Sequence, residues 1–136
     1  MGFENFGTVS FTAQSKTAEF INGLESGKVI TTKCKTCGSS YFPPRMDCPK
    51  CMSSEMEWIE LKGTGKLNTY TKVNYGPSGF ENDAPYTLAL GQFGSVQVLA
   101  RLAKDIPEKE YKVGMPITVK PLKLANNRVA YEFQKA

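Results

Sequence analysis

The four cysteines of the chain all lie in one short segment, where they form two C-x2-C pairs separated by ten residues. Each pair can form a tight turn that directs both sulfurs to one side. Two facing turns supply the tetrahedral cage of four sulfurs that Zn2+ prefers. The spacing therefore predicts one zinc ion held by Cys34, Cys37, Cys48 and Cys51. Because four protein ligands leave no position for a water molecule, this zinc would stabilise the fold rather than take part in catalysis.

The same cysteines could serve three other purposes. Two disulfides require an oxidising compartment, and the sequence shows no sign of export. A redox C-x2-C motif normally occurs singly, next to a βαβ pattern. An iron centre uses the same sulfur cage, and the spacing does not exclude it. We favour structural zinc. Gly38 follows the first pair, at a position that often needs a positive φ angle, whereas Met52 follows the second pair and predicts a less regular turn there.

The composition argues against an independent enzyme. The chain has 136 residues, about the length of one domain, and contains no histidine. This excludes Ser-His-Asp triads, Cys-His dyads and histidine-ligated metals, and it removes the usual acid–base group near neutral pH. Four thiolates and one Zn2+ lower the net charge of +4 to about +2, which is little for a protein that follows a phosphate backbone.

The sequence contains no segment typical of a membrane or secreted protein. It has no cationic leader followed by an apolar run, and no apolar stretch long enough to span a bilayer. We therefore expect a cytoplasmic protein with no membrane partner.

An amphipathic helix is predicted before the cysteines. Phe20, Ile21 and Leu24 share one face, Ser15 or Thr17 can cap the beginning of the helix, and Gly27 follows its end. Two interpretations of the apolar face remain open at this point. It packs on the zinc module, or it docks on a partner protein.

The segment around the cysteines predicts a ribbon of short strands. Residues 29–32 are β-branched and lead into the first pair, and residues 57–61, which include Trp58, alternate as a strand does. Two prolines stiffen the segment at 41–45 and hold Phe42 and Arg45 at the predicted tip of the ribbon. Phe42 either covers the sulfur cage or contacts a ligand, whereas Arg45 is difficult to explain as a core residue.

From residue 63 onward the chain consists of strands and turns. Strands are predicted at 66–75, 86–93, 96–102, 117–124 and 128–133, with turns at Gly94 and Ser95 and at Asn126 and Asn127. Five strands with one longer charged connection at 103–112 fit a small Greek-key barrel of the OB type. Other small barrels would show a similar pattern.

The order of these pieces resembles a known family. The matching residues are Phe20, Leu24 and Gly27, Cys34, Cys37 and Gly38, the Phe-Pro-Pro-Arg run at 42–45, Cys48, Pro49 and Cys51, Glu57 and Trp58, Gly63, Gly65, Tyr70 and Thr71, Pro85, Tyr86, Leu88 and Ala89, and Val113 and Gly114. The pattern resembles the DUF35-type proteins of bacteria and archaea, which join a rubredoxin-like zinc ribbon to an acyl-CoA-associated OB-fold. The resemblance begins near Thr17 and covers the rest of the chain. Met52 departs from it, because many relatives have glycine there.

The resemblance implies a mainly β fold in three parts. They are an N-terminal arm and docking helix at 1–28, a rubredoxin-like zinc ribbon at 29–62, and a five-stranded OB-fold barrel at 63–136. It also implies a role as a non-catalytic subunit that docks on a thiolase-superfamily enzyme in a hetero-oligomer and supports acyl-CoA C–C bond cleavage or formation. Our hypothesis is that Phe20, Ile21, Leu24, Phe42 and Arg45 contact that partner. Arg45 and neighbouring lysines would lie close to the phosphates of CoA, since a guanidinium matches phosphate geometry.

The main alternative is a single-stranded nucleic-acid-binding module. OB barrels bind single strands through surface aromatic rings and a basic groove. Tyr70, Tyr75 and Tyr86 are the aromatic residues that could stack on bases, although strand alternation places some of them in the core. The small net charge makes this the less favoured function.

Overall fold

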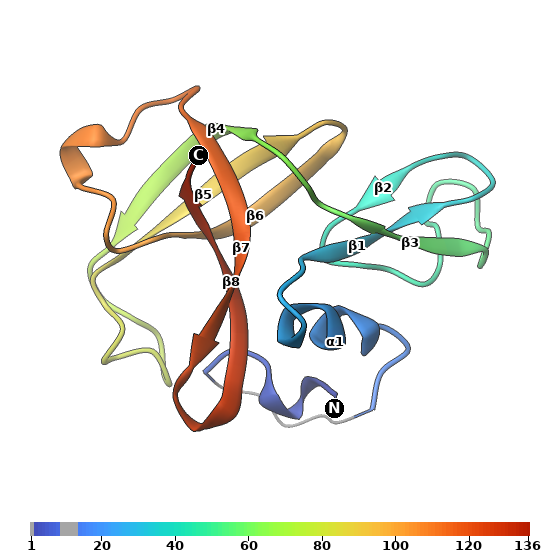
Figure 1. The fold of residues 1–136 in the computed structure, drawn as a ribbon, viewed down its shortest axis with the longest axis horizontal. Helices are drawn as coiled ribbons and strands as arrows, with labels where there is room; N and C mark the ends of the chain where they lie inside the picture. Colours follow the sequence, from blue (N-terminus) through green and yellow to red (C-terminus); the bar gives the residue numbers. More distant parts are fainter. Residues whose placement is uncertain (1, 9–13) are drawn as a thin grey trace.

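The computed structural model describes residues 2–8 and 14–136, and it consists of a small ribbon and a barrel with one helix between them (Figure 1). Residues 1 and 9–13 of the predicted arm, Phe11 among them, lie outside the described residues. The elements in chain order are η1 (Phe3–Asn5), α1 (Glu19–Glu25), β1 (Ile30–Cys34), β2 (Ser40–Tyr41), β3 (Met56–Glu60), β4 (Gly65–Val73), β5 (Tyr86–Phe93), β6 (Val96–Leu102), η2 (Glu108–Glu110), β7 (Pro116–Leu124), η3 (Ala125–Asn127) and β8 (Arg128–Lys135).

Strands β4 to β8 close into a barrel with the order β4-β5-β6-β8-β7. The pairs are antiparallel except β6 with β8, which run parallel through Arg101 opposite Glu132 and Leu102 opposite Phe133. This order and this single parallel pair are those of an OB-fold, so the predicted five-stranded OB barrel is confirmed. The connection from β6 to β7 contains only the short η2.

The barrel closes around inward-facing side chains of alternating strand positions. Phe133, Leu67, Ile117 and Val98 are fully buried in its core. Gly65, one of the glycines that carry the family resemblance, begins β4. A Cβ atom at this position would lie 2.6 Å from the Gln92 carbonyl oxygen, so only glycine lets the first barrel strand approach this closely.

The ribbon is a three-stranded sheet with the order β2-β1-β3. Its central strand β1 pairs with β3 from Ile30 opposite Glu60 to Cys34 opposite Met56, and with β2 through Thr32 opposite Tyr41. The short β2 was not predicted, because two residues carry no alternation pattern. The predicted zinc-ribbon region preceding the OB-fold is confirmed.

Helix α1 begins later than its predicted caps. The residue before it is Ala18, which has helical angles and offers no capping side chain. Neither Ser15 nor Thr17 therefore caps the helix. Instead the Thr17 N–H donates to Ser15 Oγ at 3.2 Å and closes a turn that precedes α1. Gly27, with φ of +87°, lies just past the end of the helix as predicted.

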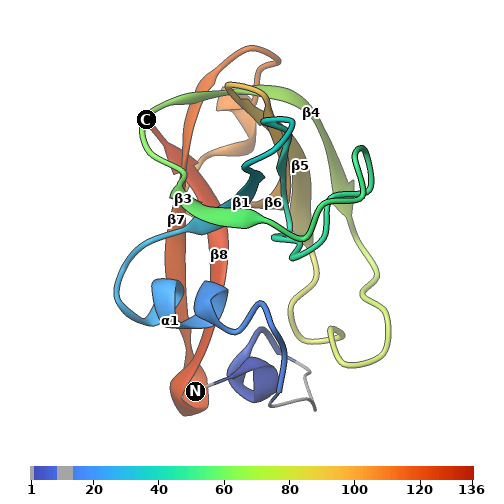
Figure 2. The same ribbon diagram turned by 90° about the vertical axis from the view of Figure 1, so that its right-hand side faces the viewer.

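The helix lies between the two units. It contacts β7 and β8 of the barrel and β1 of the ribbon, and Figure 2 shows it beside the lower part of the β7–β8 hairpin. The N-terminal arm is attached to the same hairpin, because the Gly7 N–H donates to the Val129 carbonyl and Arg128 donates to the carbonyls of Phe6 and Gly7. Arm, helix, ribbon and barrel therefore meet in one place.

Candidate metal centre

The structure brings the four cysteine sulfurs together. Their Sγ atoms all lie within 4.8 Å of one another, with 3.5 Å between Cys34 and Cys51 and 3.6 Å between Cys37 and Cys48. A disulfide requires about 2.05 Å, and all four are free thiols. A tetrahedral zinc with bonds of about 2.3 Å separates its sulfurs by about 3.8 Å, so this donor set fits such an ion.

The two cysteine turns are built in the same way. Cys34 accepts a hydrogen bond from the Gly38 N–H at 2.9 Å and donates its own N–H to the Ser39 carbonyl. In the second turn Cys48 accepts from the Met52 N–H at 2.8 Å and donates to the Ser53 carbonyl. Each turn presents its first cysteine from the buried side and its second from the exposed side.

Met52 does not make the second turn irregular, which corrects the prediction made from the sequence. It adopts a φ of +64°, close to the +78° of Gly38, and its side chain is 83% exposed. The turn accepts the methionine because the side chain extends into solvent. The cost is local, since a non-glycine residue in the left-handed region loses about 1–2 kcal/mol.

Two hydroxyl groups contact the sulfurs from outside the ligand set. The Tyr41 hydroxyl lies 3.2 Å from Cys48 Sγ, and Ser39 Oγ lies 3.3 Å from Cys37 Sγ. The Tyr41 hydrogen bond and the nearby backbone N–H groups lower the pKa of Cys48 to about 6. Hydrogen bonds with the side chain and backbone of Ser39 lower the pKa of Cys37. Both contacts favour the thiolate form, the form that binds metal.

Sequence reasoning missed the role of Tyr41. It was one aromatic residue among several between the cysteine pairs, and the sequence does not show which ring turns toward a sulfur. The contact depends on the register of β2, which pairs Tyr41 with Thr32, two residues before Cys34, and a two-residue strand leaves no pattern in the sequence.

The predicted docking face of α1 is not a free surface. Phe20, Ile21 and Leu24 are 2%, 0% and 1% exposed. They belong to one continuous core cluster with barrel residues such as Val129 and Phe133. The apolar face therefore packs within the chain. The sequence pattern allows packing on the zinc module, whereas much of the surface that covers this face belongs to the barrel.

Phe42 lies at the junction of the two units rather than at a free tip. Its ring makes edge contacts with Phe20 at 5.8 Å and with Tyr131 at 5.1 Å between centroids. The half-buried phenylalanine therefore packs where ribbon, helix and barrel meet. Arg45, by contrast, is exposed, with its guanidinium 5.5 Å from the centre of the Tyr41 ring.

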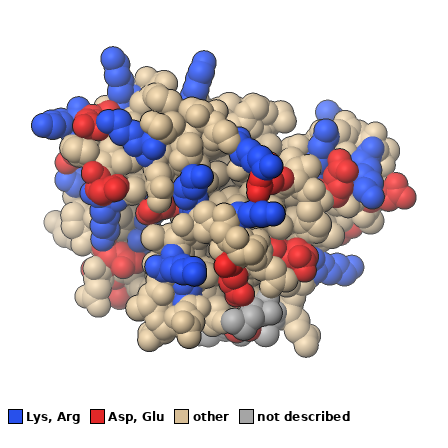
Figure 3. Space-filling view, in the orientation of Figure 1, with Lys and Arg blue, Asp and Glu red and all other residues tan. Residues whose placement is uncertain are grey.

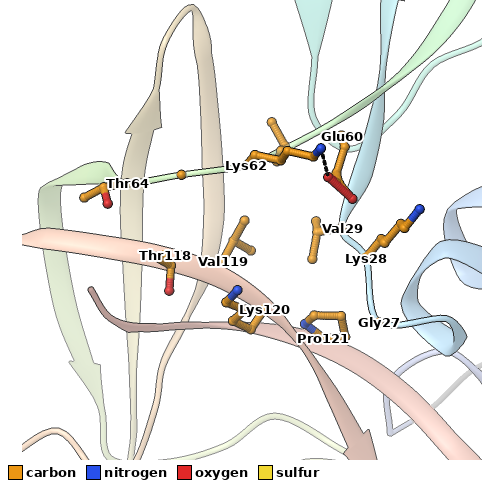
Figure 4. A pocket seen from close by; sticks show the side chains of 12 residues that line it. Gly27, Lys28, Val29, Glu60, Lys62, Thr64, Thr118, Val119, Lys120 and Pro121 are labelled. Carbon is orange, nitrogen blue, oxygen red and sulfur yellow. Dashed lines mark ion pairs between the residues drawn. The ribbon is translucent and has the colours of Figure 1, made fainter.

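A separate cavity of about 240 Å3 lies between the ribbon–barrel linker and the outer side of β7 (Figure 4). Residues 27–29, 60–64 and 118–121 line it, and Lys28, Lys62 and Lys120 are its basic side chains. Lys62 forms an ion pair of 3.1 Å with Glu60. The cavity is therefore weakly basic and contains no catalytic cluster of side chains.

The three tyrosines considered for base stacking do not form one platform. Tyr70 packs edge-on against Tyr111, and Tyr86 lies under the guanidinium of Arg101 at 4.2 Å. Tyr75 is 93% exposed. On the face shown in Figure 3, acidic and basic side chains are interspersed rather than gathered in a basic stripe. On this face the described side chains therefore do not form the continuous basic groove of a single-strand binder.

Two family models match consecutive parts of the chain. The rubredoxin-like zinc ribbon domain of ChsH2 matches residues 22–57, and the C-terminal OB-fold domain of ChsH2 matches residues 58–120. Among the described residues, no helix is long and apolar enough to cross a membrane.

Several known proteins are similar to the chain. A DUF35 domain-containing scaffold protein of Pyrococcus furiosus is 39% identical over 68% of the chain and 68% of its own length. One from Methanocaldococcus jannaschii is 38% identical over 65% of the chain, and the match spans 64% of that relative, just under two thirds. The benzoylsuccinyl-CoA thiolase subunit BbsA of Geobacter metallireducens is 26% identical over 76% of the chain and 71% of its own length.

A solved structure shows the same fold. The Ltp2-ChsH2(DUF35) aldolase structure contains a chain that superposes with a TM-score of 0.75, over 92% of this chain and 98% of the other, at 23% identity. Together with the two matched models, these similarities show that the chain belongs to the DUF35 family of proteins that join a zinc ribbon to an OB-fold.

Proposed function

We propose that the chain is a non-catalytic subunit that docks on a thiolase-superfamily enzyme and supports acyl-CoA C–C bond cleavage or formation. The observation that carries this proposal is the similarity to BbsA, a named thiolase subunit, over 76% of the chain. The chemistry of the chain agrees with it. No histidine is present, and the four thiols converge on one point, where a metal would occupy them.

The four cysteines would hold one structural zinc. The match to a zinc ribbon model supports zinc as the ion, and the distances between the sulfurs support a site with four sulfur ligands. When bound, it would supply folding energy to the ribbon. The side chains of the chain itself would hold that ribbon in a fixed position on the barrel, through the contacts of Phe42 with Phe20 and Tyr131.

Arg45 remains our candidate for contact with the partner or with CoA. Of the five residues proposed for docking, it is the one that is exposed. The lysines of the cavity beside β7 form a separate group of positive charges, which would offer a second contact for CoA phosphates. The buried face of α1 would then act indirectly, by holding ribbon and barrel in one orientation.

The test is purification of the tagged full chain from native extract, with mass spectrometry of the proteins that accompany it. We expect a thiolase-superfamily protein in fixed stoichiometry, with an acyl-CoA thiolase activity that falls when the chain is removed and returns when it is added back. Recovery of the chain alone, together with unchanged thiolase activity after its removal, would refute the proposal.

An Arg45→Ala variant locates the contact. It should weaken recovery of the partner, whereas Lys104→Ala, an exposed change on the barrel, should not. Equal recovery with both variants would remove Arg45 from the interface while leaving the proposed function standing.

A further inference from the structure

The two cysteine turns share a backbone pattern but differ in the side chains that contact their sulfurs. Cys37 has the short Ser39 side chain from its own turn as a neighbour, with 3.3 Å between Oγ and Sγ. Cys48 has the Tyr41 hydroxyl at 3.2 Å, which comes from β2 and lies outside both turns. The second turn is therefore connected to the sheet of the ribbon by a side chain, and the first is not connected in this way.

Tyr41 is held in place at both its backbone and its ring. The Tyr41 carbonyl accepts a hydrogen bond from the Thr31 hydroxyl, and Tyr41 pairs with Thr32 where β1 and β2 run side by side. The Arg45 guanidinium lies 5.5 Å from the centre of the ring. The backbone of Arg45 is also held in place, because its backbone N–H donates a hydrogen bond to Thr32 Oγ1 at 2.8 Å. The hydroxyl thus reaches Cys48 from a fixed support rather than from a mobile side chain.

We infer that Tyr41 is a positioning residue of the metal centre, whose hydroxyl donates a hydrogen bond to the Cys48 thiolate and slows loss of the bound ion. This inference rests on the zinc site described under the proposed function. Four thiolates on one Zn2+ carry a net charge of −2, so each sulfur is electron-rich and open to protonation or attack. A hydroxyl donor reduces that electron density, and the nearby Arg45 cation favours the same distribution of charge.

Cys48 is one of two buried ligands; the other, Cys34, accepts a hydrogen bond from the Cys37 backbone N–H at 3.5 Å. Cys48 is buried, with only 1% of its surface exposed, so few water molecules can reach its sulfur. Cys37 and Cys51 are exposed and can accept hydrogen bonds from solvent. The Tyr41 hydroxyl therefore supplies to a buried thiolate what water supplies to the exposed ones.

The test compares zinc release from the full zinc-loaded chain with Tyr41→Phe, which removes the hydroxyl and keeps the ring, its contact with Arg45 and the strand. Transfer of zinc to a chromophoric chelator should become about tenfold faster, the lower end of the effect usual for a group that supports a metal ligand. Tyr111→Phe, the same chemical change on the barrel, is the matched control and should leave the rate unchanged.

Cobalt provides a second readout that a general loss of stability would not produce. In the Co2+-loaded protein the sulfur-to-metal charge-transfer band should move to longer wavelength in Tyr41→Phe, because the thiolate becomes a stronger electron donor. Arg45→Ala keeps the hydroxyl and should give a smaller change in the same direction. The inference is overturned if Tyr41→Phe binds zinc but shows the same release rate and the same band position as Tyr111→Phe. Failure of the zinc assignment looks different, because in that case no variant binds zinc.

Discussion

The ribbon and the barrel differ in what fills their interiors. Between residues 29 and 62 the buried side chains are Val29, Thr31, Thr32, Cys34 and Cys48. The barrel instead buries Phe133, Leu67, Ile117 and Val98 among many other apolar residues. Full burial of one such apolar side chain is worth about 1.5–3 kcal/mol, and the ribbon has almost none of this contribution.

If the four cysteines hold the zinc proposed above, the two units draw on different sources of folding energy. A structural zinc contributes about 10–16 kcal/mol of apparent binding energy, which appears as folding energy because the site does not exist in the unfolded chain. The barrel needs no such contribution. Phe20 and Tyr131 connect the two units, since both rings contact the Phe42 ring of the ribbon.

The largest effect is expected from Cys34→Ser. It removes a buried ligand, so most of the metal-linked folding energy of about 10 kcal/mol is lost and the ribbon unfolds. Bound zinc should fall to near zero, and proteases should cut within residues 29–62. The exposed Lys50→Ala change, between the two cysteines of the second pair, is the control and should retain zinc. Normal zinc content in Cys34→Ser would contradict the idea that the metal organises the ribbon.

Phe133→Ala should have the largest effect on the barrel. Removal of a fully buried aromatic ring costs about 3–5 kcal/mol, through lost burial and the cavity that remains. Chemical denaturation monitored on barrel signals should show this loss, while zinc content under native conditions remains one per chain. Loss of zinc in parallel with barrel stability would mean that the two units do not have separate sources of stability.

Phe20→Leu tests the connection between the units. The ring of Phe20 contacts Phe3, Phe6, Phe42 and Tyr131, and a leucine keeps the burial but removes the aromatic contacts, each worth about 0.5–1.5 kcal/mol. We expect a loss of about 2 kcal/mol, the lower end of the sum over the four contacts because leucine keeps much of the packing, and a calorimetric transition that separates into two. If the transition stays single and the stability is unchanged, the aromatic cluster does not couple ribbon to barrel.

The smallest effect is expected from Met52→Gly. A non-glycine residue in the left-handed conformation costs about 1–2 kcal/mol, and glycine removes this cost. Glycine also raises the conformational entropy of the unfolded chain, which lowers the free energy of unfolding and offsets part of the gain. The net result should be a gain of up to about 1 kcal/mol, visible as slower zinc loss and a higher Tm of the ribbon. A lower Tm would show that the methionine side chain contributes contacts at the second turn.

The features that could be predicted from the sequence depend on residues that lie close together in the chain. The two C-x2-C pairs bring their sulfurs together because each pair forms a local turn, and β5 and β6 agree with the predicted bounds because alternation over such lengths is unambiguous. The apolar face of α1 was also found, but periodicity shows only that a face is buried. It does not show whether the chain or a partner covers it.

The features that could not be predicted depend on the approach of distant segments. Phe42 contacts Tyr131 only because the closed barrel places β8 beside the ribbon. The contact of Tyr41 with Cys48 depends on the register of a two-residue strand. Met52 was expected to disturb its turn, since the sequence does not show that its side chain would extend into solvent.

Hydrogen exchange of the full chain before and after removal of zinc by a chelator tests the central claim most directly. The amide protons of residues 29–62 should lose their protection when zinc is removed, because no apolar core remains to hold the ribbon. Those of the barrel strands β4 to β8 should remain protected. Retained protection in the ribbon, or an equal loss in ribbon and barrel, would contradict the account.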